Sequence, residues 1–253
     1  MTLYQCLLEK NPCLLAGRAL TPRGIVVHST GANNPTLKRY VQPHAAQTQG
    51  MARLLPDPKA LTRQELLSLL GVNTGGNDWN RPISPAVCVH GFVGRLSDGT
   101  VAAVQTLPWD VRCWGCGSGP KGSYNASHIQ FEICEDGMED PAYLETAWDT
   151  AADLCADLCR KFSIPVAAIR SHAESCRDGY ASNHGDPDHW FRRFGKTMDQ
   201  FRADVEKALG QSQTQPAIAA AVQKRFGFSG ETMAYLQSYR YAAALLEKLA
   251  NKP

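Results

Sequence analysis

Histidines at the ends of expected strands carry most of the chemistry that this sequence offers. Of the seven histidines in the chain, four end or line strand-like segments: His28, His90, His128 and His172. A single strand histidine is usually a satisfied core or surface group, but several at strand ends beside polar loops favour a shared site. A catalytic zinc ion takes three ligands of the His, Asp or Cys type and keeps a fourth position for water. The histidines therefore make a zinc centre the first chemistry to consider.

Two of these histidines, His28 and His172, directly follow short apolar runs and are the first candidate ligands. The loop after His172 adds two carboxylates, Asp186 and Asp188, and Cys176 lies four residues beyond His172. No local pattern of the HExxH type joins these residues. Spacing alone therefore leaves the third ligand open among Asp186, Asp188 and Cys176.

A carboxylate that could move protons lies in the segment SHIQFEIC, residues 127–134. Ile129, Phe131 and Ile133 alternate onto one face, and Glu132 lies on the other. A lone carboxylate on an otherwise apolar strand is costly unless it is solvated or used. Because zinc lowers the pKa of its bound water toward about 7, a carboxylate beside that water can act as a general base. Glu132 is the candidate for that role.

The elements that must position these residues are short strands joined by polar loops, together with two long helices. We expect strands at Arg23–Thr30, Ala86–Arg95, Val101–Leu107, Ser127–Cys134 and Val166–Ile169, and helices at Leu61–Leu70, 140–162 and Trp190–Leu209. Asp140 and Pro141 have the residue types of a helix N-cap and first turn. This mixture predicts an α/β fold with a mixed central β-sheet flanked by helices and a small C-terminal helical appendage.

Composition divides the chain into three parts. Residues 1–209 form the expected main domain, residues 210–216 (GQSQTQP) a polar linker, and residues 217–253 a helical segment. An apolar seam with spacings of 3 and 4 runs along that segment through Leu236, Tyr239, Ala243, Leu246 and Ala250. A segment of this length is too short for an independent core, so the seam must pack on the main domain or on a second chain. We expect a homodimer through these helices.

Charge and cysteine content exclude several classes of protein. Lys and Arg number 26 against 24 Asp and Glu, so the overall charge gives no sign of nucleic-acid binding. No apolar run approaches the ~18 residues of a membrane span, and Glu9 and Lys10 interrupt the N-terminus where a signal peptide would be apolar. Nine cysteines without an export signal indicate free or metal-bound thiols rather than disulfides.

One pair of cysteines has a spacing of its own. Cys113 and Cys116 form a CxxC, which is found in redox sites and in zinc ribbons. No second CxxC completes a ribbon, and the glycine-rich surroundings offer no helix N-terminus to lower a thiol pKa. We therefore expect loop cysteines without a catalytic role, and a thiol redox protein is the weaker alternative.

The order of these motifs is similar to that of a known family. A strand ends in His28 within VVHST, a second carries Glu132 within SHIQFEIC, and His172 is followed by Asp186-Pro187. From about Gly24 to Phe194 the chain resembles the zinc-dependent N-acetylmuramoyl-L-alanine amidases related to peptidoglycan recognition proteins, many of which are phage or prophage lysins.

The resemblance implies a fold, a cofactor and a substrate. Members hydrolyse the amide bond between N-acetylmuramic acid and L-alanine of peptidoglycan, which lyses the cell wall. It implies that His28, His172 and Asp186 hold one zinc ion and that Glu132 is the catalytic carboxylate. Residues 1–209 would then be the zinc amidase domain, and residues 217–253 would serve dimerisation or wall targeting.

Some positions depart from the family pattern. Many members carry Lys two residues before the aspartate ligand, where it stabilises the oxyanion, and His184 stands there. Some carry Tyr in the hairpin strand where this chain has His90. A donating imidazole can do the same work, so we assign His184 and His90 to oxyanion stabilisation. Asp188 replaces the usual Gly and stays a rival ligand.

Candidate substrate contacts come from the expected loops and the start of the SHIQFEIC strand. Loop tryptophans suit stacking on sugar rings or gripping a peptide stem. Together with two polar residues, they form the expected substrate-binding set: Trp79, Trp114, Asn125 and His128.

The resemblance also sets expectations for location and for the competing function. A lysin without an export signal accumulates in the cytoplasm until a separate pore releases it to act on the cell wall. A non-catalytic peptidoglycan-binding module on the same scaffold is the alternative. Such modules typically lack a zinc ligand, whereas this chain keeps three candidate ligands and Glu132, which favours the enzyme.

Overall fold

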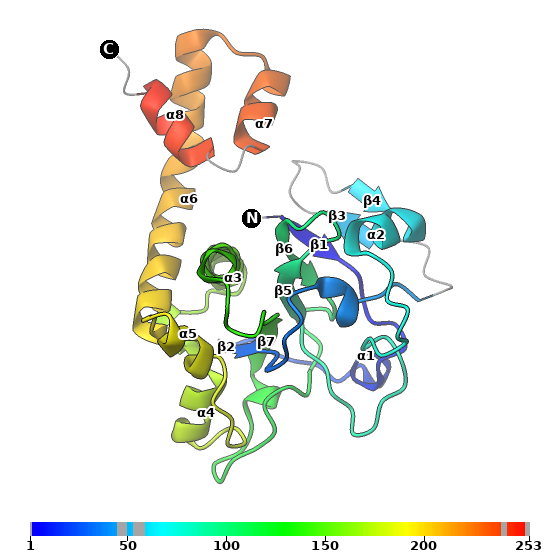
Figure 1. Cartoon of the computed structure of the whole chain (residues 1–253). Helices are drawn as coiled ribbons and strands as arrows, with labels where there is room; N and C mark the ends of the chain where they lie inside the picture. Colours follow the sequence, from blue (N-terminus) through cyan, green and yellow to red (C-terminus); the bar gives the residue numbers. More distant parts are fainter. Residues whose placement is uncertain (1, 45–49, 53–58, 239–241, 251–253) are drawn as a thin grey trace.

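The computed structural model describes residues 2–44, 50–52, 59–238 and 242–250 (Figure 1). Its strands are β1 (Leu3–Gln5), β2 (Gly24–Ser29), β3 (Gly50–Ala52), β4 (Lys59–Leu61), β5 (Gly91–Arg95), β6 (Val101–Gln105), β7 (His128–Ile133) and β8 (Ile169–Ser171). Within the described residues they form one mixed sheet in the order β4-β3-β1-β6-β5-β7-β2-β8. The mixed sheet that the sequence predicts is confirmed.

Four neighbouring strands of this sheet run parallel and end at one edge. β2 pairs in parallel with β7 on one side and β8 on the other, and β5 pairs in parallel with β7. The register places His28 opposite Glu132, and Val27 opposite Ser171. The strand-end residues that the sequence singles out therefore meet at the carboxyl edge of the sheet.

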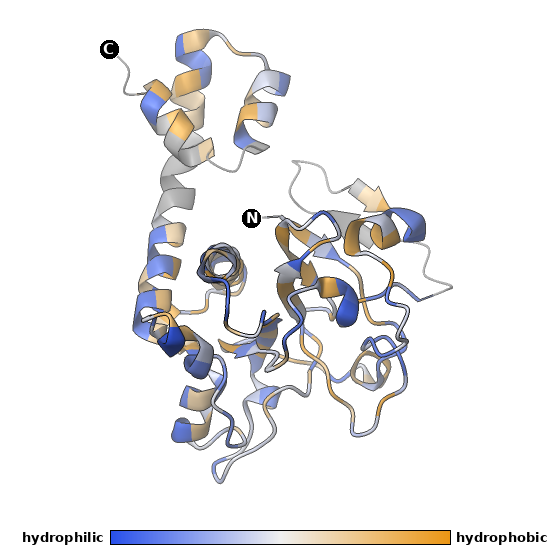
Figure 2. Cartoon of the chain, viewed as in Figure 1, coloured by the Kyte–Doolittle hydropathy of each residue, from blue (hydrophilic) through white to orange (hydrophobic). Residues whose placement is uncertain are grey.

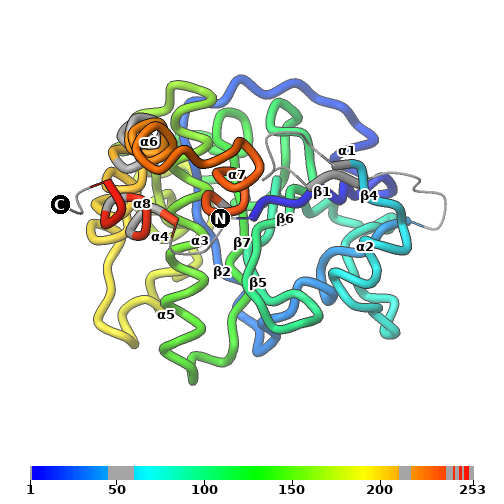
Figure 3. The backbone as a smooth tube through the Cα atoms, turned by 90° about the horizontal axis from the view of Figure 1, so that it is seen from above, coloured from blue at the N-terminus to red at the C-terminus, as the bar shows by residue number. Residues whose placement is uncertain are grey.

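Helices lie on both faces of the sheet. The helices of the described residues are α1 (Pro12–Ala16), α2 (Arg63–Leu70), α3 (Pro141–Phe162), α4 (His172–Asp178), α5 (Asp188–Arg193), α6 (Met198–Phe226), α7 (Gly230–Ser238) and α8 (Ala242–Ala250), with single 3₁₀ turns at Leu37–Arg39, Tyr124–Ala126 and Val166–Ala168. Seen from above, α3 and α6 lie on one side of the strands and α1 and α2 on the other (Figure 3). Two hydrophobic clusters follow from this layering.

The larger cluster lies between the sheet and the helices α3, α5 and α6. Trp148 of α3 meets Phe191 of α5 and Phe201 of α6 edge-on, with ring centroids 4.8 and 5.0 Å apart. On the other face, Phe92 of β5 stacks on Tyr40 at 5.1 Å. The strand β6, with the sequence VAAVQ, carries mostly hydrophobic colours in Figure 2, as a strand covered on both faces should. The sheet edge is thus held between two packed layers.

The long helix expected after residue 140 is confirmed. Asp140 is its N-cap and accepts hydrogen bonds from the backbone N–H groups of Ala142 and Tyr143, and Pro141 opens the first turn. The hairpin of β5 and β6 and the helix α2, capped by Thr62 and Glu65, also form close to their expected positions. Local signals were sufficient at these places because caps and turns are short-range.

Several expected boundaries are wrong. The single helix expected at Trp190–Leu209 is broken, because Gly195 adopts a φ of +70° and Thr197 then caps a new helix with Gln200. Val166–Ala168 is a 3₁₀ turn rather than a strand, and β8 begins only at Ile169. The helical segment expected from residue 217 onward is divided between the end of α6 and two further helices, α7 and α8.

The polar linker expected at residues 210–216 is helical. α6 runs without interruption from Met198 to Phe226, so these residues form its middle. Their composition is that of a loop, but helical turns on either side extend through them, because adding a residue to an existing helix costs far less than starting one. The connection is therefore a helical spacer.

The C-terminal helices pack on the far half of α6 instead of on the sheet (Figure 1). Val222 of α6, Met233 of α7 and Leu246 of α8 are buried in one small cluster. Leu246 belongs to the apolar seam, whereas Tyr239 lies outside the described residues. Since Leu246 is buried within the chain, the expected homodimer has no support. Within the described residues, no helix combines the length and apolarity that crossing a bilayer requires.

Truncation of Leu246 tests whether this cluster is a unit of its own. Leu246→Ala removes a fully buried side chain and should destabilise the packing of α8 on α6 by about 2–5 kcal/mol. We expect faster amide exchange in α7 and α8, measured by mass spectrometry, with α3 unchanged. Tyr235→Ala, at a side chain that is 79% exposed, is the matched control. Equal acceleration in α3 would show that tail and sheet unfold together.

Candidate metal centre

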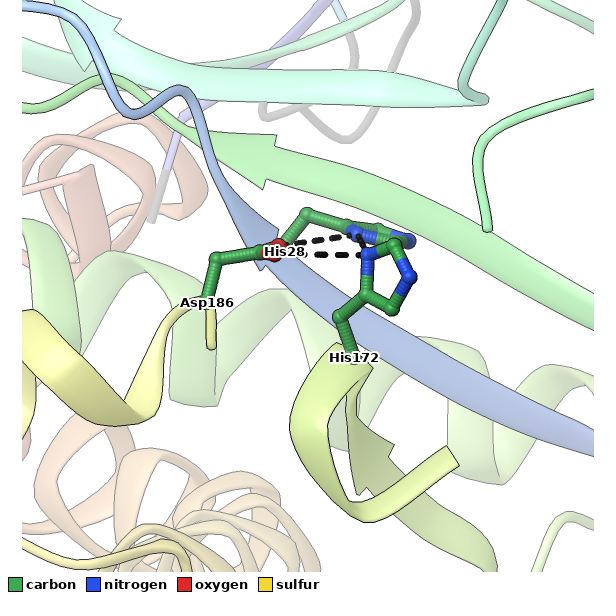
Figure 4. A group of neighbouring side chains, drawn as sticks. All are labelled: His28, His172 and Asp186. Carbon is green, nitrogen blue, oxygen red and sulfur yellow. Dashed lines mark hydrogen bonds and ion pairs between the residues drawn. The ribbon is translucent and has the colours of Figure 1, made fainter. Parts of the chain in front are cut away.

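Three side chains from three separate elements point toward one another at the carboxyl edge of the sheet. His28 comes from β2, His172 from the first residue of α4, and Asp186 from the loop before α5 (Figure 4). Their possible ligand atoms all lie within 4.8 Å of one another, and within the described residues no other such group of His, Cys, Asp or Glu occurs. The two other candidate third ligands, Asp188 and Cys176, are not part of it.

Local structure explains how each side chain reaches this point. Ser171 caps α4 in a reciprocal capping box with Glu174, which fixes His172 in the first helical turn. Arg202 of α6 holds Glu174 through two N–O contacts of 2.9 Å. The loop that carries Asp186 is tied to α4, because the backbone N–H of Ala173 donates to the carbonyl of Asp186. His172 and Asp186 are therefore braced by backbone or by an ion pair, and His28 by the pairing of β2 with its neighbouring strands.

The spacing of the three groups suits a tetrahedral metal ion. Nδ1 of His28 lies 3.1 Å from Nδ1 of His172 and 3.1 Å from Oδ2 of Asp186, and His172 Nδ1 lies 3.3 Å from Oδ1 of Asp186. Zinc bonds of about 2.0–2.2 Å in tetrahedral geometry require ligand atoms roughly 3.3 Å apart. Two histidines and one carboxylate also match a catalytic zinc donor set. The residues fit zinc by both donor type and spacing.

The histidines also set the charge of the carboxylate. Burial alone would raise the pKa of Asp186, but hydrogen bonds and attraction from His172 and His28 hold that pKa well below its usual range. Asp186 is therefore ionised at every pH at which the protein works, as a metal ligand must be.

Glu132 lies next to this group but lacks the hydrogen bonds with histidine that Asp186 has. It pairs in register with His28, yet its Oε2 atom is buried without a hydrogen-bond partner. Burial, with the nearby carboxylates of Asp186 and Glu135, raises the pKa of Glu132 well above its ordinary value. An unpaired buried carboxylate oxygen beside a metal-type cluster is the arrangement that a proton-transferring group needs.

Of the residues expected to stabilise an oxyanion, one is near the cluster. The ring of His184 is exposed, its centroid lies 4.7 Å from that of His172, and its Nδ1 contacts the Ser182 hydroxyl at 3.0 Å. His90, in contrast, is fully buried, with Nε2 on the Val111 carbonyl and Nδ1 accepting from the Gln130 backbone N–H. Both nitrogens of His90 are used, so it has no N–H to offer a substrate.

The residues expected to contact the substrate also divide into exposed and buried ones. Trp114 is 43% exposed, whereas Trp79 packs against Tyr40 and Phe92. Asn125 is buried, and its side chain is used by backbone groups and by Gln130. His128 begins β7, at the opposite end of the strand from Glu132, and its ring lies 3.8 Å from that of Tyr124 in a tilted arrangement. Only Trp114 of this set offers a broad exposed surface.

Three residues of the site escaped the sequence analysis. Gln130 and Ser182 contact the outer nitrogens of the two histidines, at 2.9 and 3.3 Å. Glu135 is buried, accepts from the Ser29 hydroxyl and pairs with His189 at 3.1 Å. The alternation of SHIQFEIC places Gln130 on the same face as Glu132, and this is the one sequence signal that points to any of these three residues.

The cysteines are free thiols, and eight of the nine are buried. Burial raises the pKa of both Cys113 and Cys116, the CxxC pair. Thiols of this kind are poor nucleophiles near neutral pH. The geometry therefore speaks against a redox function.

Comparison with known protein families identifies one family. A family model described as N-acetylmuramoyl-L-alanine amidase matches residues 18–189, a span that contains all three residues of the metal-type cluster. No curated protein matches the chain significantly.

Among solved structures the chain is similar to the catalytic domain of PlyG, with 21% identity over 83% of this chain and 96% of that one and a TM-score of 0.49. It is also similar to the Staphylococcus aureus hydrolase AmiA in complex with its ligand, with 19% identity, 76% and 74% coverage and a TM-score of 0.47. A mutant endolysin from Bacillus subtilis gives 20% identity, 80% and 97% coverage and a TM-score of 0.45. The family model, not these likenesses, carries the assignment.

The state of His90 is open to a pH test. Burial lowers the pKa of His90 to about 4, below its ordinary value, so the unfolded chain takes up the proton first as the pH falls. His90 should therefore cost stability progressively below pH ~6.5, reaching roughly 3 kcal/mol near pH 4.

NMR titration of the His90 ring should show a neutral imidazole down to about pH 5. Urea unfolding should show a smaller loss of stability between pH 7 and 4.5 in His90→Gln than in the wild type. The comparison of variants is needed because burial lowers the pKa of His128 to about 4 as well. A ring that titrates near its ordinary value would contradict the buried, doubly bonded geometry.

Proposed function

This chain belongs to the N-acetylmuramoyl-L-alanine amidase family, and we propose that it cleaves peptidoglycan with a zinc ion held by His28, His172 and Asp186. The bond cut is the amide between the lactyl group of N-acetylmuramic acid and L-alanine of the peptide stem. The observation that carries the proposal is the convergence of three zinc-type ligands beside the unpaired carboxylate oxygen of Glu132.

Amide hydrolysis needs an activated water, a proton for the leaving amine and support for negative charge on the carbonyl oxygen. When bound, zinc supplies the first need and part of the third, by lowering the pKa of water and polarising the carbonyl. The protein residues around the cluster supply the rest.

Glu132 acts as the general base and then as the general acid. Its carboxylate takes a proton from the attacking water and returns that proton to the nitrogen of L-alanine as the bond breaks. Two features support this role. Its raised pKa favours proton uptake, and no described residue donates a hydrogen bond to its Oε2.

His184 donates to the carbonyl oxygen as charge develops there. Nδ1 of His184 donates to the Ser182 hydroxyl, whose own hydrogen goes to the Cys116 carbonyl, so the imidazolium form of His184 provides the Nε2–H for the substrate. The exposed ring beside His172 supports this assignment, whereas the buried ring of His90 takes no part. The exposed indole of Trp114 is the proposed contact for a sugar ring or the peptide stem.

The cluster formed by α7, α8 and the end of α6 contains no residue of the metal centre, so we propose that it targets the wall. Residues 1–209 are then the catalytic domain. Action on the wall after release from the cytoplasm through a separate pore belongs to the same proposal.

Removal of the carboxylate tests the proton-transfer step. Glu132→Gln should lose about 10²-fold or more in rate and keep its zinc, because Glu132 is a base and not a ligand. Release of dye from labelled cell wall measures the rate, and atomic emission measures the metal. Glu139→Gln, at an exposed carboxylate, is the control. Near wild-type hydrolysis by Glu132→Gln would remove it from the mechanism.

Removal of a ligand tests the metal. We expect one zinc per chain in the wild type and loss of both zinc and activity in His28→Ala, with the fold kept because the ligand ends a strand. His44→Ala, outside the cluster, should keep both. Full zinc occupancy in His28→Ala would exclude His28 as a ligand.

The products decide between this enzyme and a non-catalytic binding module. An amidase exposes a new N-terminal L-alanine on the peptide stem, which amine labelling followed by mass spectrometry of digested walls detects. Wall binding without any new alanine amine would favour the binding module, and cleavage at another bond would contradict the proposed specificity.

A further inference from the structure

Both histidines of the metal centre use their second ring nitrogen, and both contacts lead to the same short piece of chain. We propose that Gln130 and Ser182 are positioning residues that fix the tautomers of His28 and His172, and that the Gly115–Cys116 backbone anchors both of them. The inference rests on the proposed zinc function and concerns what makes its ligands competent.

The path from His28 runs through two buried amides. Nε2 of His28 lies 2.9 Å from Oε1 of Gln130, and Nε2 of Gln130 donates to Oδ1 of Asn125 at 2.8 Å. That same Oδ1 accepts from the backbone N–H groups of Gly115 and Cys116, at 3.0 and 3.1 Å. The far side of the amide is fixed too, since Asn125 Nδ2 donates to the carbonyl of Gly117 at 2.9 Å.

This order of donors determines the protonation of His28. Backbone N–H groups only donate, so the atom of Asn125 that faces them is oxygen. The atom of Gln130 that faces this oxygen must then be nitrogen, which turns its own oxygen toward His28. An amide oxygen only accepts, so Nε2 of His28 carries the hydrogen. The lone pair of neutral His28 is therefore on Nδ1, the atom that faces Asp186 and His172.

The path from His172 is shorter and ends at the same residue. Nε2 of His172 lies 3.3 Å from the hydroxyl of Ser182, and that hydroxyl donates to the carbonyl of Cys116 at 3.2 Å. The backbone N–H of Ser182 donates to the same carbonyl at 2.9 Å. Since the hydroxyl hydrogen goes to Cys116, its oxygen accepts both from His172 Nε2 and from His184 Nδ1, which lies 3.0 Å away. Neutral His172 therefore again has its lone pair on Nδ1.

The anchor has a shape that only a small residue permits. A Cβ at Gly115 would lie 2.6 Å from Oε1 of Gln130 and 2.9 Å from Cγ1 of Val89, so any side chain there would push Gln130 away. The N–H of Cys116 serves one histidine and its C=O the other. The neighbouring Trp114 is the exposed residue proposed to touch substrate, so one loop supports both metal and substrate.

Removing a hydrogen bond to the ring nitrogen that faces away from the metal typically weakens metal binding by about 10–100-fold. Gln130→Met keeps the length of the side chain and removes the acceptor, and Ser182→Ala removes the hydroxyl. We expect each to weaken zinc binding about 10–100-fold in competition with a chromophoric chelator. The d–d spectrum of the cobalt-substituted protein should also change, because a ligand that can rotate alters the coordination geometry.

Gln105→Met is the matched control. Gln105 is also a buried strand glutamine with hydrogen bonds, to Gln5 and to the Leu107 carbonyl, and it lies on β6, outside the metal cluster. It should bind zinc within about threefold of the wild type and leave the cobalt spectrum unchanged. An equal loss in Gln105→Met would mean that affinity follows general sheet stability, and the inference would be wrong.

A measurement on the unmutated protein covers the case in which a variant does not fold. Long-range ¹H–¹⁵N spectra of the wild type should show His28 and His172 with the hydrogen on Nε2, protected from exchange with solvent. A hydrogen on Nδ1, or zinc binding by Gln130→Met and Ser182→Ala within threefold of the wild type, overturns the inference and leaves the proposed function standing. A wild type that binds no zinc overturns both.

Discussion

The parallel pairing of β7, β2 and β8 is the constraint on which the rest of the site depends. Because the three strands run the same way, their carboxyl ends meet at one edge, and the register sets His28 beside Glu132. A slip of one residue would turn His28 to the opposite face of the sheet and remove it from the cluster. Apolar packing on both faces makes such a slip costly, so burial in the core fixes the geometry of the chemistry at its edge.

Within that frame, two carboxylates a short distance apart are held in opposite states. Asp186 faces two imidazoles, which keep its pKa low, whereas burial and the nearby carboxylates of Asp186 and Glu135 raise the pKa of Glu132. Environments that push two pKa values apart are how one site obtains both an ionised ligand and a proton carrier. The division of labour proposed for these residues therefore follows from their neighbours, since the two groups are chemically alike.

The parts of this arrangement that depend on short-range patterns could be read from the sequence, and the others could not. Alternation in SHIQFEIC and the apolar run before His28 place these residues correctly at strand positions, and the Asp140 cap begins α3 as expected. The hydrogen-bond partners of a side chain, in contrast, do not follow from short-range patterns. His90 and Asn125 have the residue types of functional groups, but backbone groups 21 and 10 residues away occupy their polar atoms. The same holds for residues 210–216, whose loop-like composition is overridden by the helix on either side.

The continuous helix α6 connects the metal centre directly to the C-terminal helices α7 and α8. The first turns of α6 carry Arg202, which holds Glu174 and thereby the start of α4, where His172 lies. Its last turns carry Val222, around which α7 and α8 pack. A helix of 29 residues is about 44 Å long, so the tail lies at the end of α6 that is far from the metal centre. If the tail binds the wall, the polymer it holds is presented to the active site from one side, and the helix that sets this approach is the same helix that braces a ligand.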